Sequence, residues 1–125
     1  MGTMTDYSIV VVTPPIEGDW VSSSQYNTDV TGGEDLLAAV SGSSHYIRKI
    51  IISCGTASAT ITLGGDQSTD VTNKFLGPIT FSASATHPFV MDFGEKAMKI
   101  AVGQTFAIDG VTVAPVWIYF EYKTI

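Results

Sequence analysis

The sequence of 125 residues predicts an all-β fold, an antiparallel β-sandwich. Three observations support this prediction. Short apolar segments alternate with period two, turn residues separate them about every ten residues, and no stretch keeps a helical pattern long enough for a stable helix. A jelly roll is the preferred topology. An immunoglobulin-like sandwich is the second choice. The Cys-Trp-Cys framework of immunoglobulin domains is absent here, but many such sandwiches lack it.

The first 35 residues are expected to form a strand and a polar connector, which together are a candidate interface arm. Residues 7–13 (YSIVVVT) favour a strand, and the two prolines that follow end it because proline cannot donate to a β-ladder. Residues 18–33 are rich in Ser, Asn, Asp and Gly, which favours irregular structure. Trp20 and Tyr26 are the large aromatic residues of this connector. They either pack on the edge of the sandwich or contact a neighbouring subunit.

Residues 36–125 are expected to hold the sandwich core, so that the whole chain is a single domain. The segment 34–40 is interpreted as a strand, because a Ser-Gly-Ser-Ser turn ends it too early for a helix. Residues 46–54 are rich in isoleucine, a β-branched residue that suits a strand. Residues 57–63 alternate Ala, Ile and Leu with Ser and Thr, which predicts a strand with one face on the core.

Turns are expected to join these strands. Gly55-Thr56 is short enough to predict an antiparallel hairpin between the strands on either side of it. Residues 64–75 carry turn-forming residues throughout and predict a loop. Gly77-Pro78 is expected to mark another turn.

The last third of the chain is predicted to continue as strands and loops. Residues 97–102 alternate, with Met98, Ile100 and Val102 on one face. Residues 103–110 are expected to be a loop around Phe106 and Ile108. The remaining predicted strands are residues 79–86, 89–93 and 116–123.

Composition excludes several classes of function. Twelve acidic residues against six Lys and Arg give a formal net charge of −6, and nucleic-acid binding needs a clustered basic surface. No apolar run approaches the roughly 20 residues of a membrane span, and the first residues lack the basic start of a signal peptide. The single cysteine, Cys54, ends an isoleucine-rich strand and is expected to be a small buried hydrophobic residue.

No cofactor, metal or catalytic residue is assigned. His45 and His87 lie far apart, each beside a turn, and do not form the closely spaced pair of a transition-metal site. Asp66 and Asp70 could supply oxygen ligands to calcium, but their spacing does not match an EF-hand loop. The sequence has no G-x-S-x-G elbow and no phosphate-binding glycine loop before a helix. We therefore expect that the chain is not an enzyme.

The final predicted strand carries two large rings on its polar face. Val116, Ile118 and Phe120 form one stripe, and Trp117 and Tyr119 lie on the opposite face. If the aliphatic stripe packs on the core, the rings form a sugar-stacking platform or a protein interface. The alternative is a strand that is buried on both faces. Together with Trp20 and Tyr26, these two rings are the candidate interface residues.

A resemblance to small structural proteins of tailed bacteriophages rests on the order of several segments. These are LLAAVSG, HYIRKIIISCGTASATITLGG, FLGPITFSASATHPFVMDF, GEKAMKIAVGQ and the closing GVTVAPVWIYFEY. In that group a basic-aliphatic strand and an Ala/Thr segment are followed by a proline-aromatic strand, a G-E strand and an aromatic final strand. The chain resembles the jelly-roll decoration, or cement, proteins of the capsid over residues 36–125.

The resemblance implies a non-enzymatic protein of the virion, made in the host cytoplasm, that decorates or cements the capsid. Its expected partners are the major capsid protein and itself, as a homo-oligomer with a trimer favoured. Neither nucleic acid nor a membrane is expected as a partner. Shell contact is assigned to the polar N-terminal third, which includes Trp20 and Tyr26. The alternative function is a carbohydrate- or receptor-binding module of the phage tail.

Overall fold

The structure is a computed structural model of the chain. The structure describes residues 19–55, 59–65, 73–81, 88–94, 96–111 and 115–125. These described residues form nine β-strands and no helix. The strands are β1 (Val21–Asn27), β2 (Glu34–Leu37), β3 (His45–Cys54), β4 (Ala59–Gly65), β5 (Asn73–Phe81), β6 (Phe89–Asp92), β7 (Met98–Lys99), β8 (Phe106–Gly110) and β9 (Val116–Thr124).

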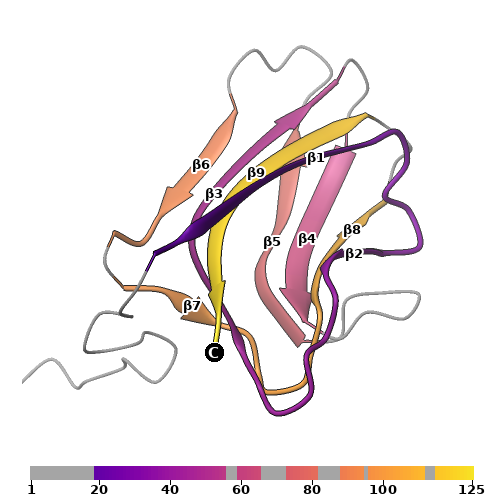
Figure 1. The fold of residues 1–125 in the computed structure, drawn as a ribbon. Coiled ribbons are helices and arrows are strands. Elements are labelled where there is room, and N and C mark those ends of the chain that lie inside the picture. Colours follow the sequence, from indigo (N-terminus) through magenta and orange to yellow (C-terminus); the bar gives the residue numbers. More distant parts are fainter. Residues whose placement is uncertain (1–18, 56–58, 66–72, 82–87, 95, 112–114) are drawn as a thin grey trace, which may run out of the picture.

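Two antiparallel sheets pack face to face, which confirms the predicted β-sandwich (Figure 1). Sheet A has the order β1-β9-β3-β6, with β7 also paired to β3, and sheet B has the order β2-β8-β4-β5. β6 and β7 pair with successive parts of β3, so they share one strand position. With that position counted once, the chain changes sheets at every connection except the one from β4 to β5, and the two strand orders are those of a jelly roll.

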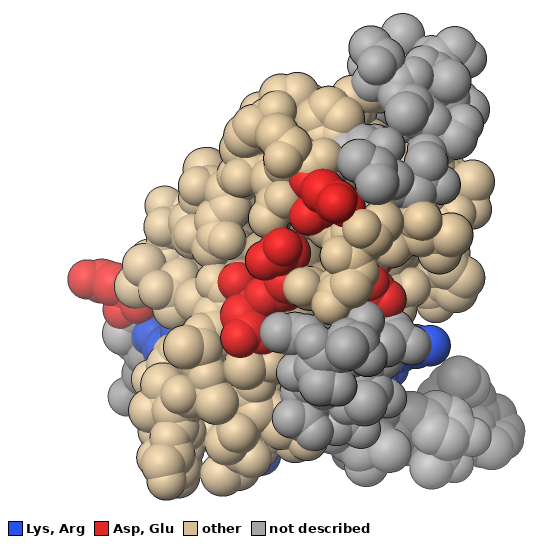
Figure 2. Space-filling view, turned by 90° about the vertical axis from the view of Figure 1, so that its right-hand side faces the viewer, with Lys and Arg blue, Asp and Glu red and all other residues tan. Residues whose placement is uncertain are grey.

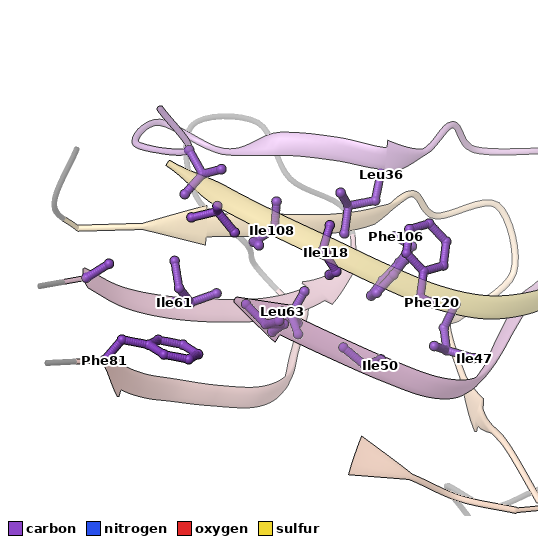
Figure 3. Packing of buried hydrophobic residues seen from close by; sticks show 14 of the residues in the cluster. Leu36, Ile47, Ile50, Ile61, Leu63, Phe81, Phe106, Ile108, Ile118 and Phe120 are labelled. Carbon is purple, nitrogen blue, oxygen red and sulfur yellow. The ribbon is translucent and has the colours of Figure 1, made fainter. Parts of the chain in front are cut away.

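The core lies between the two sheets and is built from alternating strand residues (Figure 3). Sheet A contributes residues from β3 and β9, and sheet B contributes residues from β4 and β8. Phe106 and Phe120 meet edge to face across the sheets, with ring centroids 5.1 Å apart. The fully buried side chains include Ile47, Ile50, Ile52, Ile61, Leu63, Phe106, Ile108 and Phe120. One sandwich core therefore holds the two sheets together, mainly through burial of apolar area.

The alternation in β3, β4 and β9 confirms the strands predicted there. Ile47, Ile50 and Ile52 of β3 are each 0% exposed. In β4, buried Ala59, Ile61 and Leu63 alternate with half-buried threonines, as the pattern predicted. The predicted strand at residues 34–40 is also present, but it ends at Leu37.

The predicted hairpin at Gly55-Thr56 is wrong, because β3 and β4 lie in different sheets. β3 pairs with β9 and β6, whereas β4 pairs with β8 and β5. The Gly55 amide donates to the carbonyl oxygen of Pro115 at 2.8 Å, and a Cβ on Gly55 would lie 2.6 Å from Pro115 Cγ. The connection therefore crosses between the sheets, which lets both apolar strand faces meet in one core.

Residues 18–33 were predicted to be irregular, but Val21–Asn27 within them forms β1. This strand pairs along its whole length with β9 and is an edge of sheet A. The side-chain amide of Gln25 donates to the Leu36 carbonyl at 2.9 Å, which ties β1 to β2 of the other sheet. Tertiary pairing therefore overrides the low strand propensity of the serines.

The loop predicted at residues 103–110 is also wrong, because Phe106–Gly110 forms β8. Phe106, Ala107 and Ile108 are buried at 1% exposure or less, since β8 lies between β2 and β4. The strand predicted at residues 97–102 is reduced to the two residues of β7. Val102 is 58% exposed, so it does not share a buried face with Ile100.

Gly77-Pro78 does not form a turn between strands, because it lies inside β5. Residues 73–75, predicted as loop, also belong to this strand. The pairing of β5 with β4 shifts register between Ile61 and Leu63, so a bulge absorbs the Gly-Pro pair. Gly77 has φ +113°, and a Cβ there would lie 2.6 Å from the Ile61 carbonyl oxygen. Only glycine suits this position.

Several predictions fall outside the described residues. They are the strand at residues 7–13, the calcium-ligand pair Asp66 and Asp70, His87, and the part of the predicted strand beyond Phe81. The strand predicted at 89–93 is confirmed as β6, and the division of the chain at residue 35 stays a prediction.

Candidate functional site

The outer face of sheet A, the side that points away from the core, gathers all four candidate interface residues. On β9, Val116, Ile118 and Phe120 point inward, so Trp117 and Tyr119 point outward. The register of β1 against β9 places Tyr26 opposite Trp117 and Ser24 opposite Tyr119. Trp20, just before β1, lies on the same face because its ring packs against two outward-facing cations described below.

Tyr26, Trp117 and Tyr119 form an aromatic cluster at one end of this face. The rings of Tyr26 and Trp117 lie 4.7 Å apart between centroids, at 40° to each other. Tyr26 is 53% exposed and Trp117 is 46% exposed, although both are large apolar side chains. The cluster, with Ser24, Ser53 and Ile51 among its neighbours, lines a shallow depression of about 250 Å³. An exposed, preformed apolar surface of this kind is typical of a binding face.

The other end of the face is charged, and a β-bulge creates it. The register of β3 against β9 shifts between Ile47 and Lys49, so Arg48 and Lys49 together oppose Glu121 of β9. Arg48 Nε donates to Glu121 Oε1 at 2.6 Å, and the Tyr119 hydroxyl donates to Glu121 Oε2 at 2.5 Å. The carboxylate therefore links the aromatic cluster to the charged end and holds both side chains in place.

Trp20 packs beneath two cations at this charged end. The guanidinium carbon of Arg48 lies 4.9 Å from the centre of the Trp20 ring, and the Lys123 ammonium lies 5.5 Å from it. Both distances are in the range of cation–π attraction. These contacts fix the start of β1 against the sheet, so Trp20 takes part in packing within its own chain as well as being a candidate contact residue.

The hydrogen bonds around Glu121 shift two pKa values in opposite directions. The bonds that Glu121 accepts from Tyr119 and Arg48 lower the pKa of its carboxyl group below the ordinary value of 4.5. The same bond to Glu121 raises the pKa of the Tyr119 hydroxyl, because ionisation would remove the donated proton. At neutral pH, Glu121 is therefore an anion and Tyr119 is a neutral donor.

We expect Glu121→Gln to lose about 0.5–1 kcal/mol of folding free energy at pH 7, since it removes one partly exposed ion pair. A lowered folded-state pKa stabilises the protein above the ordinary pKa, and this stabilisation is lost as pH falls through the folded value. The difference in unfolding free energy between wild type and variant should therefore shrink as the pH falls below 4.5, the ordinary pKa of the carboxyl group. Urea unfolding at several pH values measures this difference in unfolding free energy. A difference that stays constant with pH would disprove the stabilising role of the Glu121 carboxylate.

The other candidate reactive groups are placed in packing roles. Cys54 packs against the core but is only partly buried, not fully buried as predicted. This partial burial raises the pKa of its thiol, which disfavours the reactive thiolate. His45 is 3% exposed. Its Nε2 donates to the Ala38 carbonyl at 2.8 Å, and its Nδ1 lies 2.7 Å from the Thr124 hydroxyl. Within the described part of the chain, no group of three or more His, Cys, Asp or Glu side chains is placed to hold a metal ion.

Sequence reasoning missed the charged partners of the aromatic residues. Arg48 and Lys49 are the only charges of an isoleucine-rich strand, and that isolation is a signal that could have marked them. The alternation of β9 already placed Glu121 and Lys123 on the face of Trp117. What the sequence could not give is the pairing of β1 with β9, which brings Tyr26 to Trp117.

Comparison with known proteins adds little to this geometry. No protein-family model matches the chain, and no curated protein matches it. One solved structure matches, dTDP-4-dehydrorhamnose 3,5-epimerase from Bacillus anthracis str. Ames with TDP and PPi bound. The identity is 7% and the TM-score is 0.34, and the match covers 85% of this chain and 54% of that one. The chain thus spans about half the length of the epimerase chain.

The epimerase is an enzyme, and this finding contradicts the expectation that the chain is not one. That expectation is withdrawn. A likeness with a TM-score of 0.34 carries no argument about a substrate or a reaction of this chain. Among the described residues, no helix has the length and apolar character needed to cross a membrane.

Proposed function

We propose that this protein is a structural component of a bacteriophage virion that decorates or cements the capsid. The observation that carries the proposal is the aromatic cluster of Tyr26, Trp117 and Tyr119 on the outer face of sheet A. Exposed Trp and Tyr residues on a rigid sheet are the usual centre of a protein interface. The proposed partner at this cluster is the major capsid protein, and the proposed location is the virion, after synthesis in the host cytoplasm.

The architecture supports a decorating role in physical terms. The sheet that carries the cluster is held by the core behind it, so the rings are positioned before any partner arrives. Preorganised rings lose little conformational entropy on binding, which favours affinity. The resemblance of residues 36–125 to decoration proteins agrees with this reading. Homo-oligomerisation, with a trimer favoured, is part of the proposal, because capsid accessory proteins act on symmetric shells.

Co-sedimentation tests this proposal. Purified protein is mixed with mature capsids of its own virus that have been stripped of accessory proteins, at moderate salt. We expect saturable pelleting at a fixed ratio to the major shell subunit. Folded protein that stays in the supernatant at every concentration would disprove the decorating role.

The depression beside the cluster favours a second candidate function, carbohydrate or receptor binding on a phage tail. Its lining combines the rings of Tyr26 and Trp117 with the hydroxyl groups of Ser24 and Ser53. Rings can stack on the apolar face of a sugar, and hydroxyl groups can bind its polar edge. A glycan array decides between the two candidates. Binding of a glycan that Trp117→Ala abolishes, without capsid pelleting, would favour the tail module.

A further inference from the structure

Many of the charged side chains among the described residues gather on two surfaces. Arg48 and Lys49 lie on the outer face of sheet A. Lys99 and Lys123 lie on the same face, on either side of Tyr46. We name these four cations the basic corner. Glu121 and Asp92 lie among them, so these six groups together carry a net charge of +2, although the whole chain carries −6.

The opposite charge gathers on the β2–β8 side of the molecule. Glu34 and Asp35 lie on β2, Asp109 lies on β8, and Asp29 lies in the connection before β2. We name these four residues the acidic patch. Figure 2 shows acidic side chains across the middle of this face, with basic ones only at its margins. β2 and β8 themselves contain no Lys or Arg.

A cavity adds a recess to the acidic patch. It has a volume of about 200 Å³ and is lined in part by the buried residues Val30, Ile108, Val116 and Ile118. Glu34 and Asp35, which are more exposed, also line it. An apolar floor beside two carboxylates suits a lysine side chain, whose methylene groups pack on apolar surface while the ammonium stays near charge.

We infer that copies of this chain associate head to tail, with the basic corner of one copy against the acidic patch and recess of the next. This inference deepens the proposed homo-oligomer and rests on it. A contact between two different surfaces is heterologous, so it closes a ring or grows an open chain; the favoured trimer would be the closed form. The inference depends on the net charge of the two surfaces, whatever contacts each group makes within its own chain.

Charge-swap variants test the contact through size-exclusion chromatography with light scattering. The acid swap is Glu34→Lys with Asp35→Lys, and the base swap is Lys99→Glu with Lys123→Glu. We expect wild type to be oligomeric at low salt and to dissociate as salt rises, since screening shortens the Debye length from about 10 Å at 0.1 M to about 3 Å at 1 M. Each swap alone should weaken association at least tenfold, because the acid swap removes the net charge of the acidic patch and the base swap reverses the net charge of the basic corner.

An equimolar mixture of the two swaps should regain association as a heterodimer, because the unchanged basic corner of the acid swap can then meet the unchanged acidic patch of the base swap. Lys74→Glu, on β5, is the control and should associate like wild type. If a swap does not fold, judged by circular dichroism, the corresponding Gln and Asn substitutions replace it. Monomeric wild type, or an oligomer that both swaps leave intact, would overturn the inference. Capsid pelleting of the same variants is scored separately, so that failure of the contact and failure of the proposed function can be told apart.

Discussion

Phe120→Ala is expected to lower the free energy of unfolding by about 3–5 kcal/mol, the usual cost of removing a buried aromatic ring. The Phe120 side chain is 0% exposed and packs against Phe106 of the opposite sheet and Tyr122 of its own strand. Its removal leaves a cavity at the contact between the two sheets. Small domains have a free energy of unfolding of only about 5–15 kcal/mol. This single substitution should therefore remove a large part of the stability of the domain. Chemical unfolding of the two proteins measures the loss.

Trp117 provides the matched control, because it lies on the same strand but faces outward. It is 46% exposed, so Trp117→Ala should cost far less folding free energy than Phe120→Ala. Equal losses at the two positions would show that β9 is buried on both faces, the alternative that the alternating sequence left open.

Trp117→Ala is expected to weaken capsid binding about 30-fold or more, which corresponds to the 2 kcal/mol or more that defines an interface hot spot. The reason is that the Trp117 ring and its neighbour Tyr26 are preformed and exposed. Tyr26→Ala should act in the same direction, and the double variant should lose less than the sum of the two, since the rings touch. Titration of stripped capsids in the pelleting assay gives the apparent dissociation constants.

Val111→Ala is the control for this prediction, since Val111 is 75% exposed but directly follows β8 of the other sheet. It should bind like wild type. Capsid binding that survives loss of both Trp117 and Tyr26 would show that the aromatic cluster is not the interface. The N-terminal residues before β1 would then be the next candidates for the capsid contact.

The sequence predicted the strands whose side chains alternate cleanly. β3, β4 and β9 each bury one face, and their patterns of Ile, Ala and aromatic residues carry that information locally. The outward direction of Trp117 and Tyr119 follows from the same alternation, which is why both candidate residues on β9 lie where they were expected.

The parts that the sequence could not predict depend on pairing between distant segments. β1 is a polar strand that exists through its ladder to β9, and its Ser-rich sequence has weak strand propensity. β8 is buried by its neighbours β2 and β4, although its short apolar run stands between glycines. The turn at Gly55 looks like a hairpin locally, and only the two-sheet topology makes it a crossing. Tyr26 therefore lies beside Trp117 because of the pairing of β1 with β9, which no local sequence pattern predicts.

We propose that the outer face of sheet A contacts the capsid. Hydroxyl-radical footprinting of the protein, free and bound to stripped capsids, tests it most directly, because Trp and Tyr side chains react readily when exposed. We predict strong protection of Tyr26 and Trp117 in the bound state, with Val111 on the other sheet unchanged. Unchanged labelling of Tyr26 and Trp117 on protein that has pelleted with capsids would contradict the claim.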